Sequence, residues 1–273
     1  MTGGKPRVLL TNDDGVDAAG LLAVAVALSE SFDVSVVAPS RPRSASGHSV
    51  TLHKPLRLNR VDREDRPGRW FACSGTPSDC VALGYDVVLE GRVDLVVSGI
   101  NRGANLGWDL TYSGTVMGAM EGVILGAPSI AVSLVCDEGV SVSYAAAAAF
   151  ARTTAERLLD RPLPVCALLN INVPQSASSD GCAMVTHQGR REYVERVVRR
   201  EDPWGKPYYW LCGSPVDGAD DPGSDVDAIR SGIISVTPIG LDLTAFCCIE
   251  AVQDWGDWAM EPAVQTSSTG EIS

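Results

Sequence analysis

The sequence lacks several features that common classes of protein require. Its 22 Lys and Arg residues are outnumbered by 34 Asp and Glu residues, which gives a net charge of -12. Binding to a nucleic-acid polymer depends on clustered positive charge and on counterion release, so we expect no such partner. A small phosphorylated substrate is not excluded, because a metal ion bound at one site can override the overall field.

Long apolar segments are also missing. No apolar stretch reaches membrane-spanning length without charges or glycines, and the polar and basic residues 1–7 are not followed by the apolar core of a signal peptide. We therefore expect a soluble, cytoplasmic protein with no membrane partner. Its 273 residues and 45% hydrophobic content suffice for one large α/β domain, or for one domain with an added lobe.

Motifs for zinc, dinucleotides and P-loop nucleotides are absent. The eight cysteines form no C-x-x-C pair, and no His pair lies near them. Most of them lie in apolar runs such as residues 165–169, where a free thiol behaves as a small hydrophobic group. Neither Gly-x-Gly-x-x-Gly nor a Walker A lysine occurs. None of the three His residues can be given a catalytic role from the sequence.

The sequence does contain short apolar runs that end in polar loops. The first run, residues 8–11, ends at residues 12–15 (Asn-Asp-Asp-Gly), and a helical pattern follows over residues 18–29. A short apolar run bounded by turn residues is typical of a strand buried on both faces. Ligands of open α/β sheets bind beyond the carboxyl ends of strands, which is where Asp13 and Asp14 are expected.

These two carboxylates admit two interpretations. Adjacent negative charges repel each other unless a cation lies between them, and a hard divalent ion is the obvious candidate for Asp13 and Asp14. The alternative is a solvated Asx-type turn with Gly15 in a left-handed conformation. The segment taken alone leaves both open.

The order of strand, loop and helix repeats along the first two thirds of the chain. This alternation predicts an α/β fold with a doubly wound, mostly parallel sheet. Further strands are expected at residues 33–39, from residue 94, and at residues 129–134, 164–173 and 231–238, and helices at residues 80–89, 116–125 and 143–159.

After about residue 174 the pattern changes. Residues 193–200 alternate charged and apolar side chains, a turn follows at residues 202–205, and the chain returns through the aromatic residues 208–211. This pattern predicts an extended β-hairpin. Exposed aromatic side chains on such an arm favour a subunit interface over a cofactor site.

We expect a single domain followed by a short tail. The small, polar composition beyond Met260 indicates a frayed terminus. The predicted division is one domain over residues 1–262, with a core of about residues 6–174 and a C-terminal extension of about residues 175–262, and a disordered tail over residues 263–273.

Three polar loops follow the predicted strands. Residues 40–49 contain two Arg and four Ser residues, which could hold an anion, donate hydroxyl oxygens to a metal, or form an ordinary solvated loop. Residues 98–107 carry three glycines and two asparagines, which expose backbone N–H groups and offer amide oxygens to a cation. Residues 112–115 precede a helix whose N-terminus can bind an anion, although capping alone explains Ser113 or Thr115 equally well.

Two features predict helix structure rather than chemistry. Thr76, Pro77 and Asp79 have the spacing of an N-cap, a first helical residue and a capping box, so a cap is favoured over a catalytic role for Asp79. Gly118 and Gly122 are one turn apart, which indicates a helix that packs very closely on its neighbour.

Five segments occur in an order that is specific as a set. They are Thr-Asn-Asp-Asp-Gly-Val, Ala-Pro-Ser-Arg-Pro-Arg-Ser, Ser-Gly-Thr-Pro-Ser-Asp-Cys-Val, Ser-Gly-Ile-Asn-x-Gly-Ala-Asn-Leu-Gly and Tyr-Ser-Gly-Thr-Val-x-x-Ala-Met-Glu-Gly. From about Pro6 to Thr244 the chain resembles the SurE family of survival-protein 5'/3'-nucleotidases. The resemblance implies a Rossmann-like α/β fold with a C-terminal extension that serves in homodimers or homotetramers.

The resemblance also implies an activity and a site. Members of this family are phosphomonoesterases that act on nucleoside monophosphates and use one divalent ion, Mg²⁺ or Mn²⁺. The implied metal ligands are all oxygen donors, as a hard cation demands: Asp13, Asp14, Ser44 and Asn101. The implied phosphate-side residues are Asn105, Ser113, Gly114 and Thr115.

The mechanism expected from this set relies on positioning and on charge stabilisation. Asp13 would accept the proton of the attacking water or hold that water in place. Asn105 and the backbone amides of residues 113–115 would stabilise charge on the equatorial phosphate oxygens.

The chain departs from the family pattern in two places. Phe246 follows Asp-Leu-Thr-Ala where the family commonly has a His, which leaves the proton donor to the leaving group open. Ser40 and Pro42 stand where Asp and Asn are common, and this difference can alter the substrate preference.

Two other functions compete with the nucleotidase. A haloacid-dehalogenase-type phosphatase would also open with a strand that ends in acids, but it needs Asp-x-Asp, whereas the carboxylates here are adjacent. A catalytically silent metal or nucleotide sensor is suggested by Phe246, and it would show ligand-dependent stabilisation without turnover.

Overall fold

The computed structural model describes residues 4–137, 139–163, 166–177, 181–194, 197–211, 213–217 and 221–256. The chain divides into two compact units, Met1–Leu241 and Asp242–Ser273, which are described separately. The predicted tail, residues 263–273, and the first two residues of the predicted strand 164–173 lie outside the described residues. Within the described residues, the helices are too short or too polar to cross a membrane.

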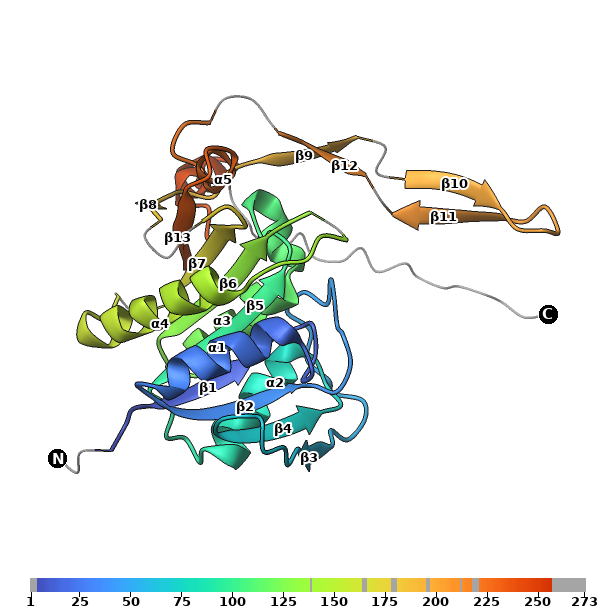
Figure 1. Ribbon diagram of the computed structural model, residues 1–273. Coiled ribbons are helices and arrows are strands. Elements are labelled where there is room, and N and C mark those ends of the chain that lie inside the picture. Colours follow the sequence, from blue (N-terminus) through green and yellow to red (C-terminus); the bar gives the residue numbers. More distant parts are fainter. Residues whose placement is uncertain are drawn as a thin grey trace, which may run out of the picture. The chain divides into compact units, whose positions relative to one another are not determined.

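The first unit is built on a mainly parallel sheet (Figure 1). Within the described residues the sheet has nine strands, in the order β3 (Leu58–Arg60), β4 (Arg69–Cys73), β2 (Asp33–Pro39), β1 (Arg7–Thr11), β5 (Leu95–Arg102), β6 (Ser129–Val135), β7 (Ala167–Pro174), β13 (Ile234–Gly240) and β8 (Ala183–Val185). The six strands that lie from β4 to β7 in this order are parallel to one another. β3 pairs antiparallel with β4, and β13 pairs antiparallel with β7.

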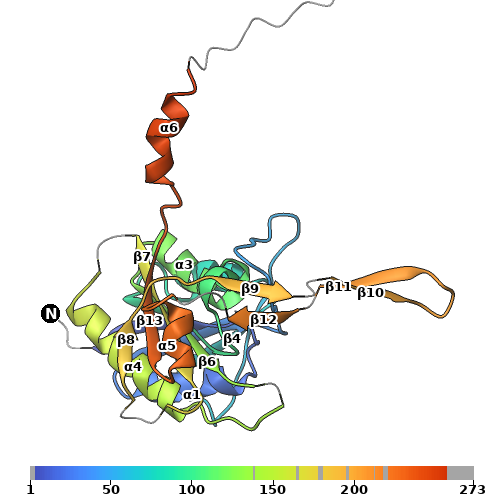
Figure 2. The same cartoon turned by 90° about the horizontal axis from the view of Figure 1, so that it is seen from above.

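Helices cover both faces of this sheet, as the predicted doubly wound fold requires. On one face α1 (Ala19–Ser29) packs against α4 (Ala145–Asp160), and on the other α2 (Pro77–Leu83) packs against α3 (Gly114–Ile124) (Figure 2). The helix α2 begins at Pro77 after the Thr76 cap, as predicted, and the rest of the predicted helix 80–89 continues as a π-helical segment, η1 (Gly84–Val88). The described residues of the first unit also form the 3-10 helix η2 (Gly107–Tyr112) and the helix α5 (Asp225–Arg230).

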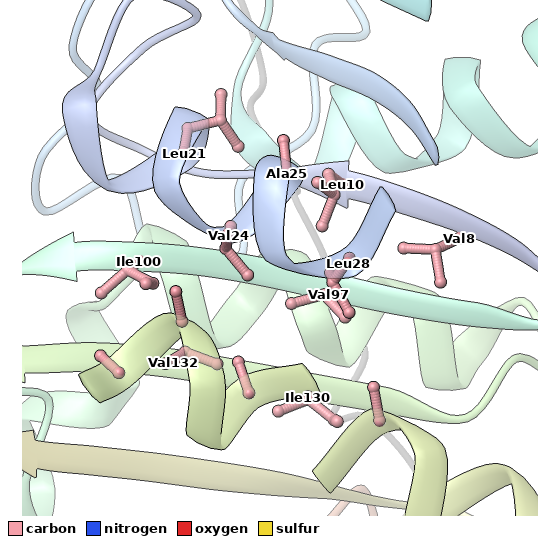
Figure 3. Close-up of a cluster of buried hydrophobic side chains, with 14 of the residues drawn as sticks. Val8, Leu10, Leu21, Val24, Ala25, Leu28, Val97, Ile100, Ile130 and Val132 are labelled. Carbon is pink, nitrogen blue, oxygen red and sulfur yellow. The ribbon is translucent and has the colours of Figure 1, made fainter. Parts of the chain in front are cut away.

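The largest hydrophobic cluster lies between the sheet and the helices α1 and α4. Val8, Leu10 and Val97 on the strands are fully buried and point toward Leu21 and Leu28 of α1 (Figure 3). Full burial of such a side chain contributes about 1.5–3 kcal/mol each. A second cluster, which includes Leu9 of β1 and Val96 of β5, covers the opposite face of the sheet. Burial of both faces explains why β1 and β5 read as continuous apolar runs rather than as alternating ones.

The strand order places one topological switch beside β1. The chain passes from β1 to β2 on one side and later returns to β5 on the other side of β1. Ligands of open α/β sheets bind at such a point, beyond the carboxyl ends of the strands. The segments that follow β1 and β5 therefore meet where a site is expected.

Close packing of α3 on the sheet confirms the prediction made from its two glycines. A Cβ on Gly118 would lie 3.0 Å from Ser98 Oγ, and one on Gly122 would lie 2.4 Å from Ser129 Oγ. Larger side chains at these positions would push the helix outward. The glycines thus set how near the N-terminus of α3 comes to the residues that follow β1.

The predicted hairpin is present as an arm of the first unit. β10 (Val197–Glu201) and β11 (Pro207–Leu211) pair antiparallel, and β9 (Arg191–Val194) pairs antiparallel with β12 (Ser214–Asp217) (Figure 1). Trp204, Trp210 and Leu211 on this arm are more than half exposed.

The second unit contains two short helices within its described residues, η3 (Phe246–Cys248) and α6 (Ile249–Gln253). Phe246, which stands where the resemblance implied a His, begins η3 and is exposed within the described chain.

Candidate active site

Asp13 lies directly beyond β1, at the switch point of the sheet. Its side chain is only 6% exposed, and the Thr115 hydroxyl donates to Asp13 Oδ1 at 2.5 Å. The turn has the Asx-type geometry of the second interpretation: Asn12 Oδ1 accepts from the Gly15 N–H at 3.2 Å, and Gly15 has a φ of 100°. The turn is not solvated, however, because Asn12 is fully buried as well.

The electrostatics of Asp13 and Asp14 favour a bound cation. Burial raises the pKa of Asp13 to about 6; the hydrogen bond from Thr115 opposes this shift and the neighbouring Asp14 adds to it. Burial also raises the pKa of Asp14, although the Arg102 N–H donates to Asp14 Oδ2 at 3.1 Å and opposes the shift. A cation between the two groups would stabilise both carboxylates.

The loop after β2 closes over Asp13. The Arg43 N–H donates to the Asp13 carbonyl at 2.7 Å, which brings the next residue, the exposed Ser44, to the edge of the site. Ser46 Oγ is buried and has no hydrogen-bond partner in the part of the chain that the structure describes. A Cβ on Gly114 would lie 2.7 Å from Ser46 Oγ and 2.9 Å from Asp13 Cβ. The absence of a side chain at Gly114 therefore lets the N-terminus of α3 pack directly against Asp13 and Ser46.

Asn101 lies inside β5, so the loop predicted after residue 98 begins later than expected. The register against β6 shifts between Gly99 and Asn101, and such bulges re-aim side chains at the ends of strands. The Asn101 amide group donates to the Gly103 carbonyl at 3.0 Å, which orients the amide and leaves its oxygen to serve as an acceptor or ligand. The next residue, Arg102, contacts Asp14 through its N–H.

Asn105 is held by a buried polar network. Its N–H donates to Asn172 Oδ1 at 2.9 Å, and its carbonyl accepts from the side-chain amides of Asn170 and Asn172, both at 2.9 Å. Its own side chain donates to Ser133 Oγ at 2.8 Å. Asn105 therefore lies over β6 and β7, with β5 between it and β1.

The N-terminus of α3 completes the arrangement. Ser113 is the N-cap, and its Oγ accepts from the Val116 N–H at 3.1 Å, as the capping interpretation predicted. The first N–H groups of a helix have no partner within the helix, so those of Gly114 and Thr115 are suited to an anion. The Thr115 hydroxyl itself is engaged by Asp13.

The structure thus joins the predicted residues in two groups. Asp13 contacts Thr115 and the residue before Ser44, and Asp14 contacts the residue after Asn101. Asn105 belongs to a separate polar group on β6 and β7. The segment that connects the two groups is η2, which starts two residues after Asn105 and ends at Tyr112, directly before Ser113.

Sequence reasoning missed the residues that hold the loops. Asn170 and Asn172 alternate on one face of a buried strand, and this pair of polar residues in an apolar run could have indicated a network. Asp79 forms the predicted capping box with Thr76 and also accepts from the Thr51 N–H at 2.8 Å and the Thr51 hydroxyl at 2.6 Å. That second role anchors the end of the loop that carries Ser44, and nothing local in the sequence indicates it.

The donor set suits a hard divalent cation. Among the described residues, no three His, Cys, Asp or Glu side chains are placed so that they could hold a metal ion together, so a thiolate or histidine centre is not supported there. Two carboxylates, an amide oxygen and hydroxyls are the ligands that Mg²⁺ or Mn²⁺ takes. The raised pKa of Asp13 and the unpaired Ser46 hydroxyl agree with a site completed by a cation and an anionic ligand.

Comparison with known proteins gives one consistent answer. A family model described as survival protein SurE matches residues 8–195. The 5'-nucleotidase SurE of Geobacter sulfurreducens is 46% identical over 257 residues, covering 94% of this chain and 96% of that protein. The 5'-nucleotidase SurE of Caldanaerobacter subterraneus subsp. tengcongensis is 44% identical over 253 residues, covering 92% of this chain and 98% of that protein.

A solved structure confirms the fold. The crystal structure of SurE protein from Aquifex aeolicus matches with a TM-score of 0.80 and 42% sequence identity, covering 92% of this chain and 100% of that one. The predicted α/β class with a mostly parallel, doubly wound sheet is therefore correct. The chain belongs to the SurE family.

Proposed function

We propose that this chain is a divalent-metal-dependent 5'-nucleotidase that hydrolyses nucleoside 5'-monophosphates, and 3'-monophosphates as a second substrate class, to nucleoside and phosphate. Relatives that are 43–48% identical over most of the chain carry the name 5'-nucleotidase. The observation that supports the proposal most is the buried Asp13 at the switch point, packed against the N-terminus of α3.

The proposed cation ligands are Asp13, Asp14, Ser44 and Asn101. When bound there, a divalent ion would neutralise phosphate charge and lower the pKa of a bound water. Mg²⁺ and Mn²⁺ both accept such oxygen donors, and the choice between them is part of the test below.

Asp13 serves as the proton acceptor in this proposal. A carboxylate beside a metal-bound water can orient that water and accept its proton. Thr115 occupies Oδ1 of the carboxylate, which leaves Oδ2 on the side of Gly114 to orient and deprotonate the attacking water. Thr115 thereby positions the base in addition to offering its backbone N–H to the phosphate.

The phosphate is held by Asn105, Ser113, Gly114 and Thr115 in this proposal. Asn105 is fixed by its network and can aim its amide at an equatorial oxygen without reorganisation. The backbone amides at the start of α3 add donors and the positive end of the helix dipole. Together they bind the anion and stabilise the charge that develops on it.

We further propose that the β10–β11 arm forms a contact between copies of the chain in a homodimer or homotetramer. Its exposed Trp204, Tyr209 and Trp210 are the residue types enriched in the centres of interfaces.

A cytoplasmic location is proposed as well, because the cysteines at described positions are free, as is usual in a reducing compartment.

The test is phosphate release from a panel of nucleoside 5'- and 3'-monophosphates in EDTA, Mg²⁺ or Mn²⁺. Wild type is expected to release phosphate only with metal, and Asp13→Asn is expected to lose at least about a thousandfold, because the proton acceptor and a metal ligand are removed together. Asp33→Asn, the same substitution at the exposed opposite end of β2, should keep full activity. Metal-induced thermal stabilisation of wild type without any turnover would indicate a sensor instead.

A further inference from the structure

The first residue of η2, Gly107, is hydrogen-bonded to a residue far away in the sequence, Asp225. Asp225, at the start of α5, is fully buried. Its Oδ2 accepts from the Gly107 N–H at 2.8 Å, and its Oδ1 accepts from the N–H groups of Gly189 at 2.9 Å and Val226 at 2.8 Å. Both oxygens of the carboxylate are therefore used to hold backbone.

Both backbone polar groups of Gly107 are hydrogen-bonded to side chains. While Asp225 accepts from its N–H, the Gln188 side chain donates to its carbonyl at 2.9 Å. Gly107 has a φ of 53°, and a Cβ there would lie 2.9 Å from the Gly189 carbonyl oxygen. A Cβ on Gly189 would in turn lie 2.9 Å from Asp225 Oδ1. The backbones of Gly107 and Gly189 are packed so closely that neither residue has room for a side chain. This packing and the two hydrogen bonds fix the position of Gly107.

Gly107 lies between the two parts of the proposed phosphate site. Asn105 is two residues before Gly107, and η2 runs from Gly107 to Tyr112, directly before Ser113, the cap of α3. The Asn170–Asn172 network fixes Asn105 from the sheet side. The spacing between Asn105 and the α3 amides is therefore set by the junction at Gly107.

We propose that Asp225 is a positioning residue for phosphate binding: it fixes Gly107 so that Asn105 and the N-terminus of α3 present their donors to one anion. This inference rests on the proposed function. Asp225 touches neither the proposed metal ligands nor the substrate, and it acts only through the backbone of the connecting segment.

The test uses Asp225→Asn, which keeps the size of the side chain but places an NH₂ group against a backbone N–H. One hydrogen bond is lost and two donors face each other, so Gly107 should shift. The expected result is a rise of about tenfold in KM for a nucleoside monophosphate and in the Kd for inorganic phosphate, with the Mn²⁺ affinity unchanged. A residue that only stabilises the fold would lower the Tm and the active fraction, and would leave KM and the phosphate Kd as in wild type.

Two further variants sharpen the result. Asp227→Asn is the matched control: Asp227 is on the same helix, contacts Arg230 and the Gly223 N–H, and should leave both constants unchanged. Gln188→Met removes the donor to the Gly107 carbonyl with little change in size, and it should raise both constants about threefold even if Asp225→Asn does not fold.

Three outcomes separate the two proposals. Raised KM and phosphate Kd in Asp225→Asn and in Gln188→Met, with wild-type values in Asp227→Asn, support positioning. Unchanged constants in the folded variants overturn it. If wild type itself releases no phosphate, the proposed nucleotidase function fails, and inorganic phosphate binding measured by calorimetry still decides the role of Asp225.

Discussion

The two halves of the candidate site are built in different ways. On the side proposed to bind the metal (the metal half), Asp13 and Asp14 follow the end of β1 and Asn101 is near the end of β5, so adjacent parallel strands bring them together. On the phosphate side, Asn105 depends on Asn170 and Asn172, more than sixty residues further along the chain. The metal side is a consequence of strand order, whereas the phosphate side is assembled by long-range polar contacts.

The two halves also differ in their electrostatics. The metal half holds two carboxyl groups whose pKa values are raised by burial, so in the absence of a cation it is an unfavourable place for charge. The phosphate half holds neutral amides whose backbone and side-chain groups are largely satisfied by each other. The first half therefore gains from its ligand, while the second is pre-organised before the ligand arrives.

The largest effect expected from breaking the pre-organised half is that of Asn105→Ala. Loss of one aligned donor to the developing charge should lower kcat/KM about a hundredfold, while the Mn²⁺ affinity stays at its wild-type value because the metal ligands are untouched. Steady-state kinetics and metal titration measure the two. Asn59→Ala, an exposed residue of β3, serves as the control. A parallel loss of metal affinity would show that the two halves are not separate.

The metal half should respond to pH with a defined sign. Asp13 must be ionised to bind a cation, and burial raises its pKa to about 6. Protons therefore compete with the metal below pH 6, and the Mn²⁺ affinity should fall about tenfold per pH unit there and level off above it. Calorimetric titration between pH 5 and 8 tests this. An affinity that is flat across pH 6 would exclude Asp13 as a ligand with this pKa.

The smallest expected effect is that of Thr115→Val. The Thr115 hydroxyl lowers the pKa of Asp13 by donating to Oδ1, so its removal should raise that pKa further. The Mn²⁺ affinity should then fall about threefold at pH 5.5 and change little at pH 8. Thr154→Val on α4 is the matched control. An equal loss at both pH values would mean that the hydroxyl acts on the fold of the site rather than on the ionisation of Asp13.

Much of the fold could be predicted because local patterns agree with the tertiary structure. Residues 33–39 form β2, the Thr76 capping box starts α2, and Gly118 and Gly122 bring α3 onto the sheet. β5 was harder, because polar and glycine residues at its end resemble a loop, while a bulge keeps Asn101 within the strand. A bulge depends on pairing with a neighbouring strand, and no local pattern encodes that pairing.

The sequence by itself determined the α/β class, the order of its elements and the clustering of acids, amides and hydroxyls beyond the strand ends, because hydrophobic periodicity and turn chemistry act over a few residues. Only the tertiary structure decided which groups hold the site in shape. Three hydrogen bonds join segments that are distant in sequence: the N–H groups of Thr51, Asn105 and Gly107 donate to the side chains of Asp79, Asn172 and Asp225, respectively. Buried polar groups need hydrogen-bond partners. Here those partners come from distant segments, which are close together only after the chain has folded.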